Sequence, residues 1–376
     1  MEGLLQGLLA IEWQMIVMWV IGGVLIYLAI AKDMEPTLLL PMGFGAILCN
    51  LPMAFDSTGV GHVLNILFDA GIDTELFPLL LFIGIGAMID FGPLLSNPRL
   101  LLFGAAAQFG IFMTLILARC LFGDTFALTD AGAIAIIGAA DGPTSILVAQ
   151  AFGTKYLGAI TVAAYSYMAL VPVVQPPFIK LVTTKKERLI RMPYAPKAVS
   201  RTTRILFPIV ITIIVSVVAP TAASLIGFLM FGNLIRECGV LESLSETAQK
   251  VLANLVTIFL GFTIALKMQA GDFLQLETLL IMGLGLIAFI VDTAGGVLFA
   301  KILNLFLKTK INPMIGAAGI SAFPMSGRIV HKMGLKEDPQ NFLLMHSIGV
   351  NVSGQIASVI AGGLILTMMT KVLGIG

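Results

Sequence analysis

The 376-residue sequence has few charged residues, few histidines and few cysteines, and each scarcity excludes a class of protein. Charged residues make up 11% of the chain and hydrophobic residues 58%, a balance that a soluble protein of this length does not have. The three histidines and three cysteines are scattered without the spacing of metal ligands. We therefore expect reduced thiols, no disulfide framework and no cluster of soft metal ligands.

Long apolar runs recur from position 11 to position 366. Runs of this length are typical of transmembrane helices, whereas the strands of a membrane barrel alternate over about 10 residues. The sequence therefore predicts an all-α polytopic membrane protein. The predicted hydrophobic segments are Ile11–Ala31, Pro36–Pro52, Leu76–Phe91, Leu100–Phe122, Ala131–Phe152, Leu157–Val182, Ile205–Met230, Val251–Leu266, Leu276–Leu307, Asn312–Val330 and Asn341–Met369, with polar, amphipathic connectors at 56–73 and 232–250.

Residues 137–147, Ile-Gly-Ala-Ala-Asp-Gly-Pro-Thr-Ser-Ile-Leu, place a carboxylate inside one of these segments. An ionised side chain at this depth costs about 3 kcal/mol or more, so such residues usually face a cavity and serve a transport pathway. Pro143 removes a backbone donor and disfavours helical geometry at Gly142, so we expect the helix to break beside Asp141. The carboxylate, the freed carbonyls and the hydroxyls that follow are hard oxygen ligands of the kind that a small cation takes.

A second interrupted segment shares part of this pattern. Met314–Arg328 repeats the Ile-Gly-Ala-Ala string and then runs through glycine and serine to Pro324. Paired interrupted segments at corresponding positions indicate inverted repeats, whose interrupted helices cross near the bilayer midplane. We predict repeat 1 at about 11–182 and repeat 2 at about 205–370, within a single membrane domain, 1–376. The alternative is that the small residues only let helices pack closely.

The composition changes sharply between the two halves. Positions 180–204 hold eight basic residues and a single acidic one, Glu187. By the positive-inside rule, the loop 183–204 is expected to be cytoplasmic. Two interpretations stay open, namely a topology signal alone and a docking surface for an acidic partner or for anionic lipid head groups.

Several strings of the sequence match one known family. They are Gly-Ala-Ala-Asp-Gly-Pro-Thr-Ser at 138–145, Ala-Ala-Tyr-Ser-Tyr-Met-Ala-Leu-Val-Pro at 163–172, Gln-Pro-Pro at 175–177, Asn312-Pro313 with Gly316, Ser321 and Arg328, and Asn-Val-Ser-Gly-Gln at 351–355. Together they resemble the β subunit of the biotin-dependent sodium-pumping decarboxylases, which belong to oxaloacetate, methylmalonyl-CoA or glutaconyl-CoA decarboxylase complexes. The similarity covers essentially the whole chain.

The resemblance implies a multi-pass subunit of a bacterial or archaeal plasma membrane that decarboxylates carboxybiotin and uses this reaction to export Na+. The carboxybiotin would be presented by a partner and not be bound covalently to this chain. The implied partners are a carboxyltransferase α subunit, a biotin carrier protein or domain, a small single-span γ subunit, further β subunits in an oligomer, and membrane lipid. Nucleic acid is not expected as a partner.

The resemblance also implies which residues take part in the chemistry. The implied catalytic residues are Asp141, Tyr167 and Arg328, and Arg328 is also the residue that would bind carboxybiotin. The residues that would hold Na+ are Asp141, Asn312, Gly316, Ser321 and Asn351.

The residue types themselves leave alternatives open. Asp141 either offsets the charge of a cation or holds a proton, and its structural alternative is a carboxylate bonded to helix-end amides. Tyr167 is expected to carry a proton beside a bound cation. Arg328 either receives the carboxylate of carboxybiotin through its bidentate fork or extends from a helix end toward the interface. Asn312 is either an ion ligand or an N-cap with proline after it.

Three classes of function compete for these residues. In the first, carboxybiotin decarboxylates at the cytoplasmic mouth and consumes a proton, while a proton replaces the Na+ held at Asp141 and the Na+ leaves outward. In the second, the chain is a sodium/proton antiporter or a sodium-coupled organic-anion transporter not linked to biotin. In the third, an intramembrane aspartyl protease pairs Asp141 with Asp292, which is disfavoured because no matched motif surrounds Asp292.

Overall fold

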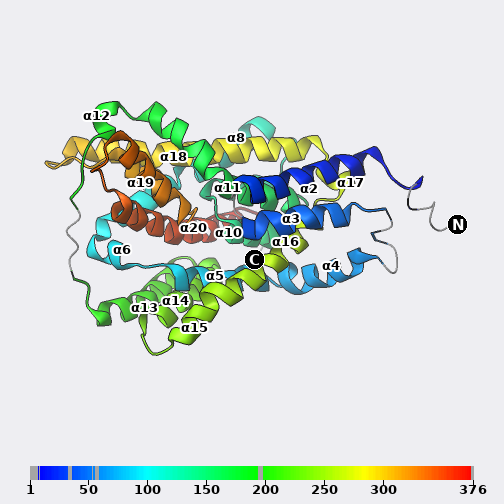
Figure 1. Ribbon diagram of the computed structural model, residues 1–376, viewed down its shortest axis with the longest axis horizontal. Coiled ribbons are helices and arrows are strands. Elements are labelled where there is room, and N and C mark those ends of the chain that lie inside the picture. The colour runs from blue at the N-terminus through cyan, green and yellow to red at the C-terminus, as the bar shows by residue number, and fades with distance from the viewer. Residues whose placement is uncertain are drawn as a thin grey trace.

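The computed structural model describes residues 7, 9–32, 36–52, 54, 55, 59–193 and 198–373. Most of these residues are helical, and none of them belongs to a strand. Figure 1 shows the helices as a bundle elongated along one axis. The three cysteines are free thiols. The predicted all-α class is therefore confirmed.

Within the described residues, six helical stretches are long and apolar enough to cross a membrane. They are α2 (Trp13–Lys32), η2 through α8 (Pro98–Phe122), α13 (Arg201–Val218), α15 through α16 (Glu242–Ala265), α18 (Leu276–Phe306) and α20 (Leu344–Leu373). α11 (Leu157–Val182) is bent by 67° and adds a seventh if its two parts are one span. The chain is therefore a multi-pass membrane protein, as predicted.

Shorter elements make up two of these stretches, and others connect or interrupt the rest. They are α3 (Pro36–Cys49), α4 (Val60–Phe68), η1 (Asp69–Asp73), α5 (Leu76–Met88), α6 (Gly92–Ser96), η2 (Pro98–Leu100), α7 (Leu101–Ala107), α8 (Phe109–Phe122), α9 (Leu128–Ala135), η3 (Ile136–Ala139), α10 (Gly142–Ala151), α12 (Lys185–Arg188), η4 (Pro220–Ala222), α14 (Ala223–Glu237), α15 (Glu242–Glu246), η5 (Thr247–Leu252), α16 (Ala253–Ala265), α17 (Ala270–Phe273), η6 (Pro313–Gly319) and α19 (Met325–Glu337).

One predicted span is in fact two helices. The sequence predicts a single segment over Ile205–Met230, but α13 ends at Val218 and α14 begins at Ala223. Pro220 lies between them and lacks the N–H that would continue α13. α14 packs against α13 and runs on to Glu237, so the first part of the predicted polar connector 232–250 is helical.

The helices form two packing groups. In the first, α2 packs on α3, α3 on α16, and α5 on α14 and α16. In the second, α18 packs against α7, α8, α11 and η6, while α20 packs against α7, α10, α19 and η6. α11 lies along α18 just as α20 lies along α7, and η3 packs on α18 just as η6 packs on α7. In each of these four contacts, one element lies in predicted repeat 1 and the other in predicted repeat 2, as is expected of inverted repeats that pack on each other. The repeats and their boundaries stay a prediction.

Candidate functional site

The first interrupted segment breaks at Asp141. α9 and η3 run to Ala139, and Ala140 takes a left-handed conformation with φ of 51°. Asp141 is extended, and α10 starts directly after it with Pro143 in its first turn. The missing N–H of proline costs nothing there, because the first N–H groups of a helix have no partner within it. The predicted break is therefore present.

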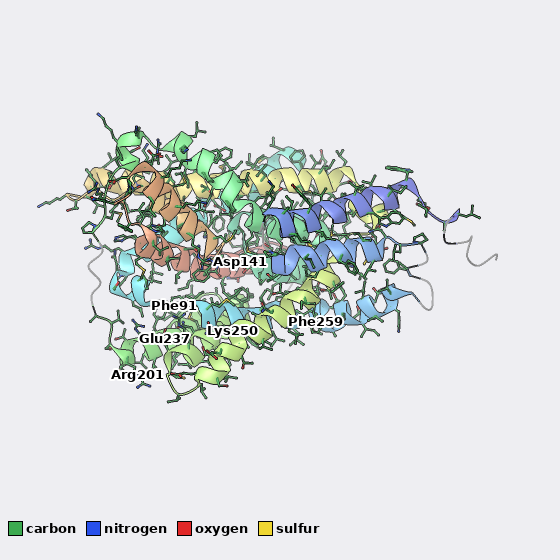
Figure 2. All side chains as sticks on the ribbon, in the orientation of Figure 1. Phe91, Asp141, Arg201, Glu237, Lys250 and Phe259 are labelled. Carbon is green, nitrogen blue, oxygen red and sulfur yellow. The ribbon has the colours of Figure 1, made fainter. Side chains whose placement is uncertain are left out.

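The carboxylate of Asp141 is 4% exposed and bonded to hydroxyl groups. Its Oδ2 accepts hydrogen bonds from Thr144 Oγ1 at 2.7 Å and from Ser358 Oγ at 2.9 Å. Its Oδ1 accepts the N–H of Thr144 at 3.5 Å, which makes Asp141 the N-cap of α10. Figure 2 places the residue in the interior of the bundle. A buried carboxylate with neutral donors around it is suited to take up a cation.

The second interrupted segment meets the first in space. η6 ends at Gly319, and α19 begins only at Met325. Between them, Ser321 donates its N–H to Ala139 O at 2.9 Å, so a backbone hydrogen bond joins the two breaks. The hydroxyl of Ser321 donates to Gly354 O in α20 at 2.9 Å. The two stretches that the sequence pairs are thus neighbours.

One face of α20 contacts both breaks. Ser358 donates to Asp141, while Asn351 donates from Nδ2 to Ile320 O at 2.7 Å and Gln355 donates from Nε2 to the carbonyl of Ser321. Asn351 is among the predicted site residues, whereas Gln355 and Ser358 are not. Their spacing of four and three residues puts all three on one side of a helix, which is a signal that the sequence does contain.

Gly316 packs backbone to backbone against α18. A Cβ atom added to Gly316 would lie 2.0 Å from Gly296 O, and one added to Gly296 would lie 2.1 Å from Gly316 O. Only glycine at both positions allows this approach. The structure therefore gives Gly316 a packing role, and its role as an ion ligand stays a prediction.

Two tyrosines of α11 face different neighbours. Tyr167 donates its hydroxyl to the carbonyl of Met282 in α18, and its ring stacks on Phe289 with 6.5 Å between centroids. The ring of Tyr165 lies against the first break, because a Cβ on Gly142 would come within 2.2 Å of it. Tyr165 thus joins the residues beside Asp141, and the proton-carrying role of Tyr167 stays a prediction.

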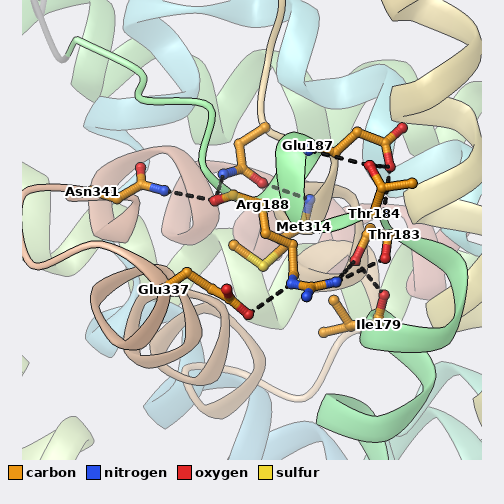
Figure 3. Close-up of polar contacts among 9 residues, drawn as sticks. Ile179, Thr183, Thr184, Glu187, Arg188, Met314, Glu337 and Asn341 are labelled. Atoms are coloured by element: carbon orange, nitrogen blue, oxygen red, sulfur yellow. Dashed lines mark hydrogen bonds and ion pairs between the residues drawn. The ribbon is translucent and has the colours of Figure 1, made fainter.

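Asn312 holds the basic loop in place. Its Nδ2 donates to Arg188 O and to Ile190 O, both at 2.9 Å. Its Oδ1 accepts the N–H of Met314 at 3.1 Å, with Pro313 at the start of η6, so the N-cap interpretation is confirmed. Figure 3 shows the same loop held by the ion pair of Arg188 with Glu337 at 2.7 Å. The role of Asn312 as an ion ligand stays a prediction.

Arg328 lies on an exposed face of α19. Across the ranges that the structure describes, its side chain makes no hydrogen bond and no ion pair. Lys332 and Lys336 follow Arg328 at steps of four residues and are also exposed. Arg328, Lys332 and Lys336 therefore form one basic face of α19. The nearby Asp338 is engaged, since a hydrogen bond from Arg191 holds the pKa of its carboxyl below the usual value. The basic face of α19 is therefore free to meet an anion.

Asp292 is a second buried carboxylate, 1% exposed, in α18. Its Oδ1 accepts the N–H of Gly110 at the start of α8 at 2.5 Å. Its Oδ2 faces Gly138, where an added Cβ would lie 2.6 Å away. Within the described part of the chain, no hydrogen bond joins it to Asp141, and no group of three His, Cys, Asp or Glu residues is placed to hold a metal. A cation at Asp141 would therefore have one carboxylate as a ligand and would otherwise depend on neutral oxygens.

The sequence was compared with known proteins. A family model described as the Na+-transporting oxaloacetate decarboxylase beta subunit matches residues 14–369. The chain is 50% identical over 366 residues to the methylmalonyl-CoA decarboxylase subunit beta of Veillonella parvula, covering 97% of this chain and 96% of that one. It is 50% identical over 364 residues to the glutaconyl-CoA decarboxylase subunit beta of Acidaminococcus fermentans, covering 97% and 96%. It is 46% identical over 407 residues to the oxaloacetate decarboxylase beta chain of Klebsiella pneumoniae, covering 93% and 94%. The chain therefore belongs to the family of β subunits of the Na+-transporting decarboxylases.

Proposed function

We propose that this chain, the membrane subunit of a Na+-transporting decarboxylase, decarboxylates carboxybiotin and exports Na+ through its two interrupted segments. The observation that carries the proposal is the buried carboxylate of Asp141 at the point where the two breaks are joined by the hydrogen bond from Ser321 to Ala139. Broken helices that meet inside a bundle provide free carbonyls for a cation without exposing them to lipid.

The groups around Asp141 fit Na+ as cargo. Na+ is a hard cation and prefers oxygen, which the carboxylate, the hydroxyls of Thr144 and Ser358 and the carbonyls of the breaks supply. The two hydroxyls donate to the carboxylate in this structure, and by rotation each can instead turn a lone pair toward a cation. Entry of Na+ would therefore need little movement of the backbone.

An exchange of Na+ for a proton at Asp141 balances the charge. Carrying one positive charge outward against 100 mV costs about 2.3 kcal/mol, and a proton that moves inward through the same site offsets this electrical work. Decarboxylation breaks the bond between carbon and nitrogen of carboxybiotin, leaves the electron pair on nitrogen and consumes one proton there. Decarboxylation at the cytoplasmic mouth would therefore consume protons on the side of the membrane toward which they leave Asp141.

The basic end of the molecule fits the delivery of carboxybiotin. α19 and the loop 183–193, which contains α12, lie at the same end of the molecule as α6 in Figure 1. We place the biotin carrier there, together with the carboxyltransferase α subunit that loads it, and a γ subunit and further β subunits within the membrane. A basic surface would steer an anionic carrier toward it at a rate that falls with salt.

Arg328 is expected to bind the carboxylate of carboxybiotin. Arg328→Ala should lower kcat/KM for free carboxybiotin about 100-fold, which corresponds to about 2.7 kcal/mol. Arg328→Lys should recover only part of this loss, because lysine lacks the bidentate fork. The measurement is the decarboxylation rate of the purified complex over a range of carboxybiotin concentrations, with Lys332→Ala, on the same face, as the control that changes it a few-fold at most. An unchanged kcat/KM in Arg328→Ala would show that Arg328 only extends toward the interface.

A reconstitution experiment separates this function from an uncoupled antiporter. The purified complex in proteoliposomes should accumulate Na+ when its acyl substrate is decarboxylated, and avidin, which sequesters biotin, should abolish the accumulation. Proteoliposomes that contain this chain alone should show no Na+/proton exchange under an imposed proton gradient. Fast exchange by the chain alone, insensitive to avidin, would overturn the proposal in favour of the antiporter.

A further inference from the structure

Three basic side chains surround one cavity at the basic end of the molecule. They are Arg99 in η2 and Lys308 and Lys310 in the turn after α18, and they line a cavity of about 510 Å3. Met192 and Pro193 of the basic loop line the same cavity. Because the positive-inside rule puts that loop in the cytoplasm, the cavity is expected at the cytoplasmic surface of the membrane.

The positive charges of these three side chains are not paired with acids. Across the residues that the structure describes, Arg99, Lys308 and Lys310 are exposed and form no ion pair. The ammonium group of Lys310 donates to the carbonyl of Asn304 and keeps two further N–H groups. No aspartate or glutamate of the described ranges lines the cavity. The charge of the cavity is therefore complementary to that of an anion.

The turn that carries the two lysines is held by one side chain. Asn304 accepts the N–H of Ile311 on its Oδ1 and donates from its Nδ2 to Ile311 O, both at 2.8 Å. These two hydrogen bonds close the chain between residues 304 and 311, where α18 ends. Lys308 and Lys310 thus stand on a closed turn, so less conformational entropy is lost when they bind a ligand.

The remaining walls of the cavity are largely apolar. Leu102 and Phe103 of α7, with Leu303 and Leu307 at the end of α18, supply much of them. A second cavity of about 550 Å3, lined mainly by apolar side chains of α7, α8 and α18, follows along the same helices. Phe103 of the first cavity contacts Phe299 of the second, with 5.2 Å between the ring centroids. We call the two cavities together the α7/α18 groove.

We propose that the α7/α18 groove binds an anionic phospholipid of the cytoplasmic leaflet. The phosphate of the head group lies among Arg99, Lys308 and Lys310, and an acyl chain extends along the apolar walls. Basic pockets between transmembrane helices on the cytoplasmic side are suited to head groups of this kind. A soluble anion would match the charges but leave the apolar walls unfilled. A transmembrane helix would match the walls but leave the charges without a partner.

The test is thermal unfolding of the purified full chain in detergent, titrated with dioleoyl phosphatidylglycerol or with dioleoyl phosphatidylcholine. Each basic residue near an anionic lipid contributes about fivefold to binding, so three contribute about 100-fold. The anionic lipid should therefore raise the midpoint of unfolding at concentrations about 100-fold lower than the zwitterionic lipid. Arg99→Gln/Lys308→Gln/Lys310→Gln should abolish this preference. If that variant fails to fold, Lys308→Gln alone should reduce the preference about fivefold.

Lys180→Gln/Lys185→Gln/Lys186→Gln is the matched control. It removes three exposed positive charges, at the end of α11 and in α12, that do not line the cavity. The preference for the anionic lipid should stay within threefold of that of the unchanged chain. An equal loss in both triple variants would overturn the inference, because general surface charge would then select the lipid. An unchanged preference in the cavity variant would overturn it as well.

Ala105→Phe tests the apolar part of the groove. Ala105 is exposed in α7 and lines the second cavity, so a phenyl ring there should take the space of an acyl chain. The dioleoyl anionic lipid should bind at least tenfold more weakly to this variant, and unchanged binding would contradict the proposal. Inorganic phosphate that stabilised the unchanged chain as well as the lipid does would identify a site for a soluble anion instead. Loss of the lipid preference in the complete complex would assign the groove to another subunit, which would also overturn the inference.

Discussion

Asp141→Asn is expected to abolish Na+ export driven by decarboxylation and to raise the Na+ concentration for half-maximal decarboxylation by at least about 100-fold, or about 2.7 kcal/mol. Asparagine keeps the size of the side chain, and the hydroxyls of Thr144 and Ser358 can turn to accept from its NH2 group. The fold should therefore persist while the negative charge at the first break is lost. The measurement is the decarboxylation rate of the purified complex as a function of Na+, together with Na+ uptake by proteoliposomes.

Ser358→Ala serves as the control for this variant. It removes one hydroxyl from Asp141 but leaves the charge, so the Na+ requirement should rise by only about tenfold, near the lower end of the roughly 1.5–3 kcal/mol that a hydrogen bond to a charged group contributes. Wild-type Na+ dependence and transport in Asp141→Asn would contradict the assignment of the carboxylate to the ion. The carboxylate would then have only its structural role as the N-cap of α10.

The position of the breaks could be predicted from local chemistry. Gly142 and Pro143 next to a carboxylate disfavour a continuous helix whatever surrounds them, so the break at Asp141 follows from three residues. The pairing of this break with the one at Ser321 follows from the repeated Ile-Gly-Ala-Ala string, and the structure joins them through Ala139. Both inferences need only sequence neighbours or internal similarity.

Contacts between distant segments could not be predicted in this way. Gln108 reaches Gly319 across 211 positions because α7 packs on η6, and its apolar neighbours in the sequence give no sign of this. Asn351 and Gln355 show a polar face on α20, but the sequence does not say which element that face meets. The orientation of Tyr165 and Tyr167 is a similar case, because residues two apart on a helix point in different directions and only tertiary packing selects one. Side-chain partners in this bundle thus depend on helix rotation, which hydropathy does not determine.

Gly316→Ala is expected to lower the stability of the chain by about 3 kcal/mol or more and its Na+ transport by more than tenfold. The added methyl group would lie 2.0 Å from Gly296 O and 2.4 Å from Gly296 C, both backbone atoms that no side-chain rotation can move. η6 would have to shift away from α18 and would carry the break at Ser321 with it. The measurement is the midpoint of thermal unfolding of the purified chain, compared with Na+ transport by the complex.

Gly295→Ala is the matched control for this substitution. Gly295 lies beside Gly296 in α18, but a Cβ there would meet its nearest atoms, Ala106 O and Phe109 Cβ, at an ordinary 3.6 Å. The same chemical change should therefore leave unfolding and transport nearly unaltered. If Gly316 acted only through its carbonyl as an ion ligand, alanine would keep that oxygen, and both measurements would match the control. Loss in Gly316→Ala alone would therefore mean that close contact of two backbones keeps the second break where the ion needs it.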